Sequence, residues 1–382
     1  MHQDKHKSFD SPLLGNCPAT LPSRAYYAPD WFERDLNQIW ARNWIYVGRD
    51  NDLKASTMKR LNVAGQNLML IKSRAGAITC FHNTCRHRGS ELCIVDQKTL
   101  SGQLIVCPYH AWSYDLNGKL IGTGLAKPTD DFRKEVHGLF AVHVNIHNGF
   151  VFVCLADNPP QFEHAYDGGP DALNNWPMAD LVTGHTLIKT LNCNWKGFWE
   201  NYNECLHCPG VHPTLCDRVP IYRKGIMSPQ EAQDWTENSE LPAGNLKNGA
   251  KTWTVDGQPC GPEFPKLTAE QKSSGYLFVT MLPTCYIVAH VDYVRVVSMR
   301  PLTPETTELT AQWLFAPQTL QSKEFDLHNV VDFATTVMME DALACELNQK
   351  GLRSSKYQGG TLMPEEFDVF NFQEWVRKHL NC

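Results

Sequence analysis

The chain has 382 residues, more than one hydrophobic core usually accommodates, so we expect two domains or one large domain with a smaller one attached. Its 42% hydrophobic and 20% charged residues are ordinary for a soluble protein, and a net charge of -6 without a Lys/Arg-rich run argues against nucleic-acid binding. The N-terminal residues show no basic head followed by an apolar stretch, and no window reaches the roughly 18 apolar residues that span a bilayer, so we expect a cytoplasmic protein without a membrane segment.

The first part of the chain is predicted to be rich in strands. Apolar residues at helical spacing, among them Phe32, Leu36 and Ile39, predict a short amphipathic helix. Short β-rich runs with turn signals follow, and Asn117-Gly118 between alternating residues is typical of a hairpin. We therefore predict an N-terminal helical segment packed on the second domain (1–39) and a small all-β domain (40–157).

A stretch rich in Pro, Gly, Asn and Asp marks the predicted boundary, and residues 158–382 differ in character. A helix is expected from about Trp195 and a long one from about Lys323, with three or four strands between them. The polar stretch 217–272 has no clear pattern and is a candidate lid over a pocket. The predicted fold class is α+β, with an antiparallel sheet flanked by helices in the second domain.

Two short loops of the all-β region each carry one cysteine and one histidine. They are Cys85-x-His87 and, after a gap of 19 residues, Cys107-x2-His110. Two thiolates and two imidazoles can bind tetrahedral zinc, or a 2Fe-2S cluster with the cysteines on one iron and the histidines on the other. Zinc fingers pair their cysteines on one loop, whereas a Rieske cluster takes one Cys and one His from each loop, so the interleaved order favours the cluster. Structural zinc stays the alternative.

A second group of metal-ligand residues lies in "ENYNECLHCPGVHPTLC", residues 200–216. On one continuous helix, an aromatic face that we expect in the core holds Trp195, Trp199, Tyr202 and Leu206. The opposite face holds Glu200, Glu204 and His207.

Pro209-Gly210 separates His207 from His212, and we expect this pair to break the helix and fold His212 back toward His207. Asp341 interrupts the apolar face of the long C-terminal helix, where an unpaired carboxylate would be costly, so we expect it to have a cation partner. Its neighbour Glu340 points about 100° away and is predicted to face solvent. Two histidines and one carboxylate would form the 2-His-1-carboxylate site of non-haem Fe(II), with a buried ion pair as the alternative.

The chain has 14 cysteines, spread along its length unlike those of a small disulfide-linked secreted protein. We predict free thiols or metal ligands, and we interpret the C-x2-C pair Cys205 and Cys208 as a coincidence beside the site, pointing to other helix faces than His207. An isolated cysteine is most simply a small buried apolar residue. That interpretation applies to Cys17, Cys154, Cys193, Cys260, Cys285 and Cys345.

Both motif sets resemble those of Rieske non-haem iron oxygenases, in that family's order. The stretch from "CRHRG" through "CPYHAWSYDLNGKLIG" is similar to the Rieske domain, and Glu204-x2-His207-x4-His212 with a distant Asp341 is similar to the catalytic domain of the terminal (alpha) subunit. The chain departs from the family in a slightly long gap between the two loops and in Ala111, where glycine is usual. Many members also carry aspartate in place of Glu204.

The resemblance implies two cofactors. A Rieske-type [2Fe-2S] cluster would be held by Cys85, His87, Cys107 and His110. A mononuclear non-haem Fe(II) would be held by His207, His212 and Asp341. Glu204 would connect that iron to the cluster of a neighbouring subunit, within a homotrimer that receives NAD(P)H electrons from a flavin/iron-sulfur reductase.

The implied activity is hydroxylation of a small organic substrate with O2. Glu204, "ENYNECLHCPGVHP" and "EEFDVFNFQEWVRKHL" resemble the branch that acts on carnitine, choline or betaines, so we expect oxidative N-demethylation or monooxygenation of a quaternary ammonium compound. Aromatic side chains would suit such a cation, although each is more simply a core residue. The candidates are Tyr276, Phe278, Tyr286, Tyr293 and Trp313. The alternatives are an aromatic-ring hydroxylating (di)oxygenase and, in another class, a non-catalytic iron-sulfur or zinc-binding protein.

Overall fold

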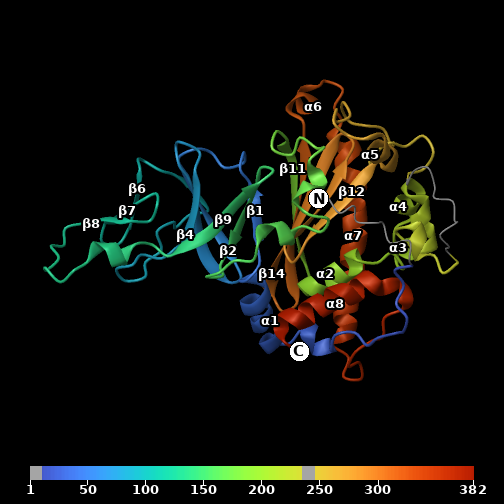
Figure 1. Ribbon diagram of the computed structural model, residues 1–382, viewed down its shortest axis with the longest axis horizontal. Coiled ribbons are helices and arrows are strands. Elements are labelled where there is room, and N and C mark those ends of the chain that lie inside the picture. The colour runs from blue at the N-terminus through green and yellow to red at the C-terminus, as the bar shows by residue number, and fades with distance from the viewer. Residues whose placement is uncertain (1–10, 235–245) are drawn as a thin grey trace, which may run out of the picture.

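The computed structural model describes residues 11–234 and 246–382, which form an elongated molecule (Figure 1). A strand-rich part lies at one end of the long axis, and helices pack around another sheet at the other end. The predicted fold class is confirmed, with a small all-β part and a part built on an antiparallel sheet flanked by helices.

Two sheets make up the strand-rich part. Within residues 11–234, the larger one joins its strands antiparallel in the order β1-β10-β9-β4-β3-β2-β5. Its strands are β1 (Ile45–Arg49), β2 (Thr57–Val63), β3 (Gln66–Lys72), β4 (Ile78–His82), β5 (Gln97–Thr99), β9 (Ala141–His147) and β10 (Phe150–Cys154). The smaller one contains β6 (Leu104–Val106), β7 (Trp112–Asp115) and β8 (Leu120–Thr123). A 3-10 turn, η3 (Lys134–His137), precedes β9.

The predicted hairpin is confirmed between β7 and β8, where Trp112 pairs with Thr123. Gly118 has a φ of 82°, which favours glycine, and a Cβ there would lie 2.5 Å from the ring of Phe81. The turn therefore packs closely against β4.

The second part is built on an antiparallel sheet of order β11-β15-β14-β13-β12. Its strands are β11 (Val182–Leu191), β12 (Tyr276–Met281), β13 (Cys285–His290), β14 (Tyr293–Thr303) and β15 (Thr306–Phe315). Since side chains alternate along a strand, one face holds Val279, Ile287 and Val296 in a hydrophobic cluster with Phe150 and Phe152. The other face packs against two helices and forms one wall of the site described below.

Helices cover this second sheet and frame its edges (Figure 1). The α-helices are α1 (Pro29–Arg34), α2 (Trp195–Tyr202), α3 (Cys208–Val211), α4 (Pro213–Arg218), α5 (Ala269–Ser274), α6 (Pro317–Gln321), α7 (Leu327–Leu352) and α8 (Phe367–Leu380). Shorter or π-type turns are η1 (Ser23–Tyr26), η2 (Asp35–Trp40), η4 (Phe162–Ala165), η5 (Pro170–Leu173), η6 (Pro220–Lys224), η7 (Pro229–Glu231) and η8 (Pro364–Glu366). The predicted long C-terminal helix is α7.

The N-terminal elements contact the helices of the second part. Asp35 of η2 forms a fully buried ion pair with Lys196 of α2 and accepts a hydrogen bond from Trp195 Nε1 at 3.0 Å. An unpaired buried charge would be costly, so this pair anchors the segment. Residues 1–10 lie outside the described residues, and the division at 39 and 157 stays a prediction.

Candidate active site

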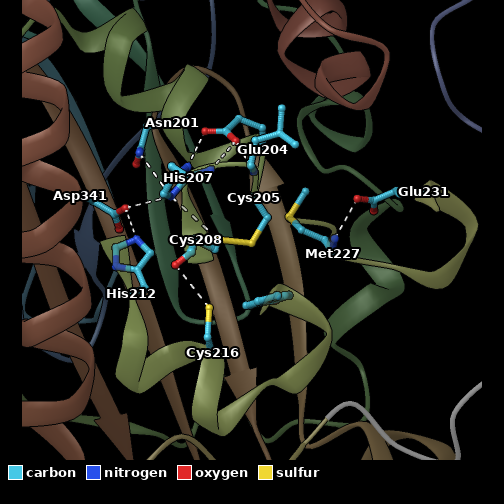
Figure 2. Close-up of a disulfide and its surroundings, with 12 residues drawn as sticks. Asn201, Glu204, Cys205, His207, Cys208, His212, Cys216, Met227, Glu231 and Asp341 are labelled. Carbon is cyan, nitrogen blue, oxygen red and sulfur yellow. Dashed lines mark hydrogen bonds and ion pairs between the residues drawn. A yellow bond between two sulfur atoms is a disulfide. The ribbon is translucent and has the colours of Figure 1, made fainter. Parts of the chain in front are cut away.

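The structure brings His207, His212 and Asp341 together between α3 and α7 (Figure 2). One possible ligand atom from each lies within 4.8 Å of the other two. Asp341 Oδ1 lies 2.7 Å from His212 Nε2 and 3.4 Å from His207 Nε2. Two imidazole nitrogens and a carboxylate oxygen are the donor set of a facial non-haem Fe(II) site, so these residues fit that ion.

The chain reaches His207 through a turn, and the predicted continuous helix is wrong beyond Tyr202. Helix α2 ends there, and Glu204 Oε2 accepts from the backbone N–H of Leu206 at 2.5 Å and of His207 at 3.3 Å. A side chain that bonds nearby backbone groups competes with helix continuation, which explains the break. Leu206, predicted in the core, is 41% exposed.

Glu200 belongs to a different environment from the one predicted. It accepts hydrogen bonds from the hydroxyl of Tyr26 at 2.6 Å and from Gln373 Nε2 at 2.9 Å. Burial raises its pKa to about 7, against these hydrogen bonds, which lower it. Glu200 therefore ties α2 to the N-terminal segment and α8.

The predicted role of Pro209-Gly210 as the helix break is also wrong. Both residues lie inside α3, with Pro209 in the first turn, where its missing N–H costs no hydrogen bond. The chain turns at His212 instead, which has φ -118° and ψ 66° and precedes Pro213. A proline ring disfavours the helical conformation of the residue before it, so Pro213 ends α3 and orients His212.

A carboxylate contacts Nδ1 of each histidine. Glu204 Oε1 pairs with His207 Nδ1, and Glu340 Oε2 lies 2.7 Å from His212 Nδ1. Because a carboxylate only accepts, each Nδ1 donates and each Nε2 is left to face Asp341. The solvent-facing prediction for Glu340 is wrong, since its longer side chain reaches around the ring that Asp341 contacts from the other edge.

The contacts of this cluster change its titration. Burial lowers the pKa of His207, but the hydrogen bonds to Asp341 and Glu204 outweigh burial and raise it to about 9. For Asp341, burial raises the pKa, and hydrogen bonds to His207 and His212 outweigh it in the opposite direction. The site thus favours ionised Asp341 beside a positive charge.

The C-x2-C pair forms a disulfide, contrary to the prediction of free thiols (Figure 2). Cys205 and Cys208 have Cα atoms 5.0 Å apart, within the range that a disulfide bridges. Helix α2 ends at Tyr202, so Cys205 lies in the turn and Cys208 begins α3. The pair lies beside the site, with Cys208 Sγ 4.0 Å from His207 Nε2.

The predicted burial of isolated cysteines holds for most of them. Cys17 is exposed and Cys260 is only partly buried. Buried free thiols are Cys154, Cys193, Cys285 and Cys345.

The two predicted cluster loops lie together at the far end of the strand-rich part. Cys85 and Cys107 are each 3% exposed, whereas His87 and His110 are exposed, with ring centroids 4.9 Å apart. The hydroxyl of Tyr114 lies 3.2 Å from Cys85 Sγ. A Rieske cluster has two cysteines on one iron and two histidines on the other. The buried thiols and the exposed imidazoles of these loops suit the inner and the outer iron, so the residues fit that group.

Ala111 explains why glycine is usual at its position. It has a φ of 55°, in the left-handed region that L side chains rarely adopt. The loop is also crowded, since a Cβ on Gly124 would lie 2.3 Å from the carbonyl oxygen of His110.

A cavity of about 970 Å³ adjoins the histidine pair and is walled by α2, α3, α7 and the second sheet. Of the predicted aromatic candidates, Phe278 and Tyr286 line it, whereas Tyr293 and Trp313 are fully buried in the core. Tyr276 does not line it but contacts the ring of Phe278. The lining rings missed by the sequence predictions include Tyr202, Tyr222 and Trp253.

The missed rings carried weak signals. Tyr202 was assigned to the core, and Tyr222 and Trp253 lie in the polar stretch 217–272, where no periodicity marks an inward face. That stretch supplies part of the cavity wall, and its residues 235–245 lie outside the described residues.

Comparisons with known proteins place the chain in a family. Residues 43–133 match the family described as Rieske [2Fe-2S] domain, and residues 163–381 match the one described as ring hydroxylating alpha subunit (catalytic domain). The chain belongs to the ring-hydroxylating alpha-subunit family. As a member with both domains it is a Rieske-type oxygenase, an oxidoreductase whose cofactors are a Rieske 2Fe-2S cluster and a mononuclear non-haem iron.

Several family relatives have names that specify a substrate. The chain is 29% identical to the glycine betaine monooxygenase oxygenase subunit of Chromohalobacter salexigens, over 93% of this chain and 84% of that protein. It is 27% identical to the carnitine monooxygenase oxygenase subunit of Acinetobacter baumannii, over 91% of this chain and 89% of that protein. The crystal structure of the quaternary ammonium Rieske monooxygenase CntA with an inhibitor shares the fold, with a TM-score of 0.72, 22% identity and coverage of 95% and 96% of the two chains.

No helix within residues 11–234 and 246–382 has both the length and the hydropathy needed to cross a bilayer.

Proposed function

We propose that this oxygenase hydroxylates a quaternary ammonium compound, most simply at an N-methyl group. The observation that carries the proposal is the aromatic cavity beside His207, His212 and Asp341. Ring faces attract methylated cations, and this wall presents several of them. The named activities of the relatives in two genera agree with such a substrate.

The metal ligands are assigned as the sequence predicted. His207, His212 and Asp341 are proposed to hold the ferrous ion. The 2Fe-2S cluster is proposed on Cys85, His87, Cys107 and His110. When bound, the cluster supplies electrons one at a time, and the ferrous ion supplies open positions for O2 beside the substrate.

The residues around the histidines would fix the geometry of that site. Glu204 and Glu340 hold the Nδ1 protons, so each imidazole keeps the tautomer that presents Nε2. The rings of Tyr202 and Tyr286 stack with centroids 4.2 Å apart and line the cavity, where they would exclude water and hold the substrate.

The proposed reaction balances with two electrons. One oxygen atom of O2 enters an N-methyl C–H bond, and the other leaves as water, with two electrons and one proton from NAD(P)H and a second proton from solvent. The resulting N-hydroxymethyl group loses formaldehyde as its C–N bond breaks; its O–H proton goes to solvent, and the electron pair of the broken bond remains on nitrogen. The net result is demethylation.

Electron delivery is proposed to occur between subunits. In Figure 1, β6 and β7, which flank the second cluster loop, lie near one end of the long axis, and α3 lies near the other end. This separation supports our proposal that a neighbouring subunit brings its own cluster near the histidines, within a homotrimer and with Glu204 as the connecting residue. We also propose a flavin/iron-sulfur reductase as donor and a cytoplasmic location.

The test is turnover of the holoenzyme with a reductase and NADH across glycine betaine, carnitine, choline and simple aromatic hydrocarbons. Formaldehyde release from one or more quaternary ammonium compounds is expected, with none from the hydrocarbons. Hydroxylated ring products without formaldehyde would instead assign the chain to ring hydroxylation.

A further inference from the structure

A buried arginine faces the aromatic cavity without a counter-charge. Arg295 of β14 is 4% exposed and lines the cavity. Its Nε and Nη1 are buried, and no acceptor from residues 11–234 or 246–382 bonds either of them. None of the ion pairs formed by the described residues includes Arg295.

The register of the sheet places Arg295 on the cavity face. Arg295 pairs with Val288 of β13, and Val288 pairs with Phe278 of β12. Directly paired residues share a face, so the guanidinium group projects from the same side as the lining ring of Phe278. The adjacent row holds Tyr286 paired with Thr280, and both of these also line the cavity.

A second unpartnered donor lies next to the guanidinium group. Trp253 is 3% exposed, lines the same cavity, and its Nε1 has no acceptor among the described residues. Arg295 Cζ lies 6.0 Å from the centre of the Trp253 ring. Two buried donors from separate segments, β14 and the loop before α5, thus lack an acceptor at one place.

Burial of a guanidinium charge without a partner is costly, and so is each unmet donor. Arginine forms strong two-pronged hydrogen bonds with a carboxylate, which would offset both costs at once. Arg295 lines the cavity that Tyr286 shares with Asp341. Burial and Asp341 raise the pKa of Tyr286, and Arg295 lowers it in part. Tyr286 is therefore close enough to feel both groups.

We infer that Arg295, with Trp253 beside it, binds a carboxylate of the substrate, so the preferred substrate is a zwitterion with a quaternary ammonium group and a carboxylate. The inference rests on the proposed function and narrows it from quaternary ammonium compounds in general to betaines. The carboxylate binds at Arg295 while the methylated nitrogen lies against the rings of Tyr202 and Tyr286, toward the histidines.

Three ligands of similar size allow the contributions of the ammonium and carboxylate charges to binding to be measured separately. Glycine betaine has both, choline has only the cation, and 3,3-dimethylbutyrate has the carboxylate with a neutral tert-butyl group. Dissociation constants are measured by calorimetry on the holoenzyme without reductant, so that no turnover occurs. The variants are Arg295→Gln and Arg295→Lys, with Arg300→Gln as control because Arg300 lies on the same strand, pairs with Glu308 and does not line this cavity.

The wild-type protein is expected to bind glycine betaine roughly 10- to 100-fold more tightly than choline. Arg295→Gln should reduce that ratio to near one, weaken 3,3-dimethylbutyrate by a similar factor and leave choline within about threefold. The affinity ratio of Arg295→Lys should lie between those of the wild type and Arg295→Gln. The ratio of Arg300→Gln should match that of the wild type. The lysine variant keeps the test valid if the glutamine variant does not fold.

An unchanged ratio of glycine betaine to choline in folded Arg295 variants would overturn the inference. Equal binding of 3,3-dimethylbutyrate to wild type and variants would do the same. If no quaternary ammonium compound binds or turns over, yet 3,3-dimethylbutyrate binds through Arg295, the carboxylate site stands and the proposed function fails.

Discussion

The two histidine-containing regions of this oxygenase are built in opposite ways. At the cluster loops, His87 and His110 are exposed and come from one short stretch of neighbouring loops. At the catalytic site, His212 is 1% exposed and contacts an acid 129 residues away in sequence. A group that exchanges electrons with partners needs an exposed edge, whereas a site that reacts with O2 benefits from exclusion of water. The difference teaches that the cluster region is built from contacts between residues close in sequence and is exposed. The catalytic region is built from contacts between residues far apart in sequence and is largely buried.

The strongest test of this separation is His207→Ala. We expect turnover to fall by roughly 1000-fold or more, because a proposed iron ligand is removed, while the visible spectrum of the cluster stays unchanged. Iron analysis should find one iron fewer per chain. Loss of the cluster spectrum in this variant would break the assignment of the two regions.

Glu204→Gln tests the proposed connection between the regions. The amide still bonds near His207 but carries no charge, so we expect both metals to remain and turnover to fall roughly 10- to 100-fold. Steady-state formaldehyde release and iron content are the measurements. Undiminished turnover would remove Glu204 from the electron path.

Glu340→Gln tests the carboxylate that the sequence predicted to face solvent. We expect the affinity for iron to fall roughly tenfold, because His212 Nδ1 loses a charged acceptor. Iron titration of the chelated protein measures it, with Asp332→Asn as control because Asp332 lies on the same helix and its side chain is 59% exposed. Equal losses in both variants would contradict the role of Glu340.

Glu200→Gln should change the pH dependence of stability in the enclosed part. The pKa of Glu200 is raised from 4.5 to about 7, so its stabilising contribution is full below pH 4.5 and is lost as pH rises through 7. Between pH 4 and pH 8 the free energy of unfolding of the wild type should fall by up to about 3 kcal/mol through this group. The variant should not show that fall. Urea denaturation at several pH values measures the difference, and parallel curves for the two proteins would contradict it.

The smallest effect is expected in the open region. Ala111→Gly relieves a left-handed alanine and should stabilise the cluster loops by about 1 kcal/mol or less, since glycine also makes the unfolded chain more flexible. Thermal unfolding measures it. Ala77→Gly, at a turn position without positive φ, should destabilise slightly, and a gain there would show that Ala111 is not special.

The contrast between the regions also decides what the sequence could predict. The cluster loops and the hairpin after Trp112 depend on residues close in sequence, so spacing and turn chemistry were sufficient. Asp341 was predicted as a ligand because it interrupts an apolar helix face, and His207 and His212 because of their spacing; the structure brings the three together. The roles of Glu340 and Arg295 were not predictable from the sequence. That of Glu340 depends on its contact with the distant His212, and that of Arg295 depends on the absence of an acceptor among the described residues around it.

The two errors in the path of the chain around His207 and His212 have different local causes. The helix was extended through His207 because periodicity cannot detect a side chain that bonds its own backbone, as Glu204 does. That extension placed Leu206 in the core, although it is 41% exposed. The turn at His212 was assigned to Pro209-Gly210 because both residues usually break helices, although proline is well tolerated in a first turn.

Consecutive residues of α7 contact the two nitrogens of one imidazole: Glu340 reaches Nδ1 of His212 and Asp341 reaches Nε2. The plane of that ring is therefore coupled to the rotation of α7 about its own axis. A single-residue insertion in α7 before Glu340 would turn both carboxylates by about 100° and remove them from the ring together. The sequence register of this helix is thus as much a part of the proposed iron site as the proposed ligands themselves.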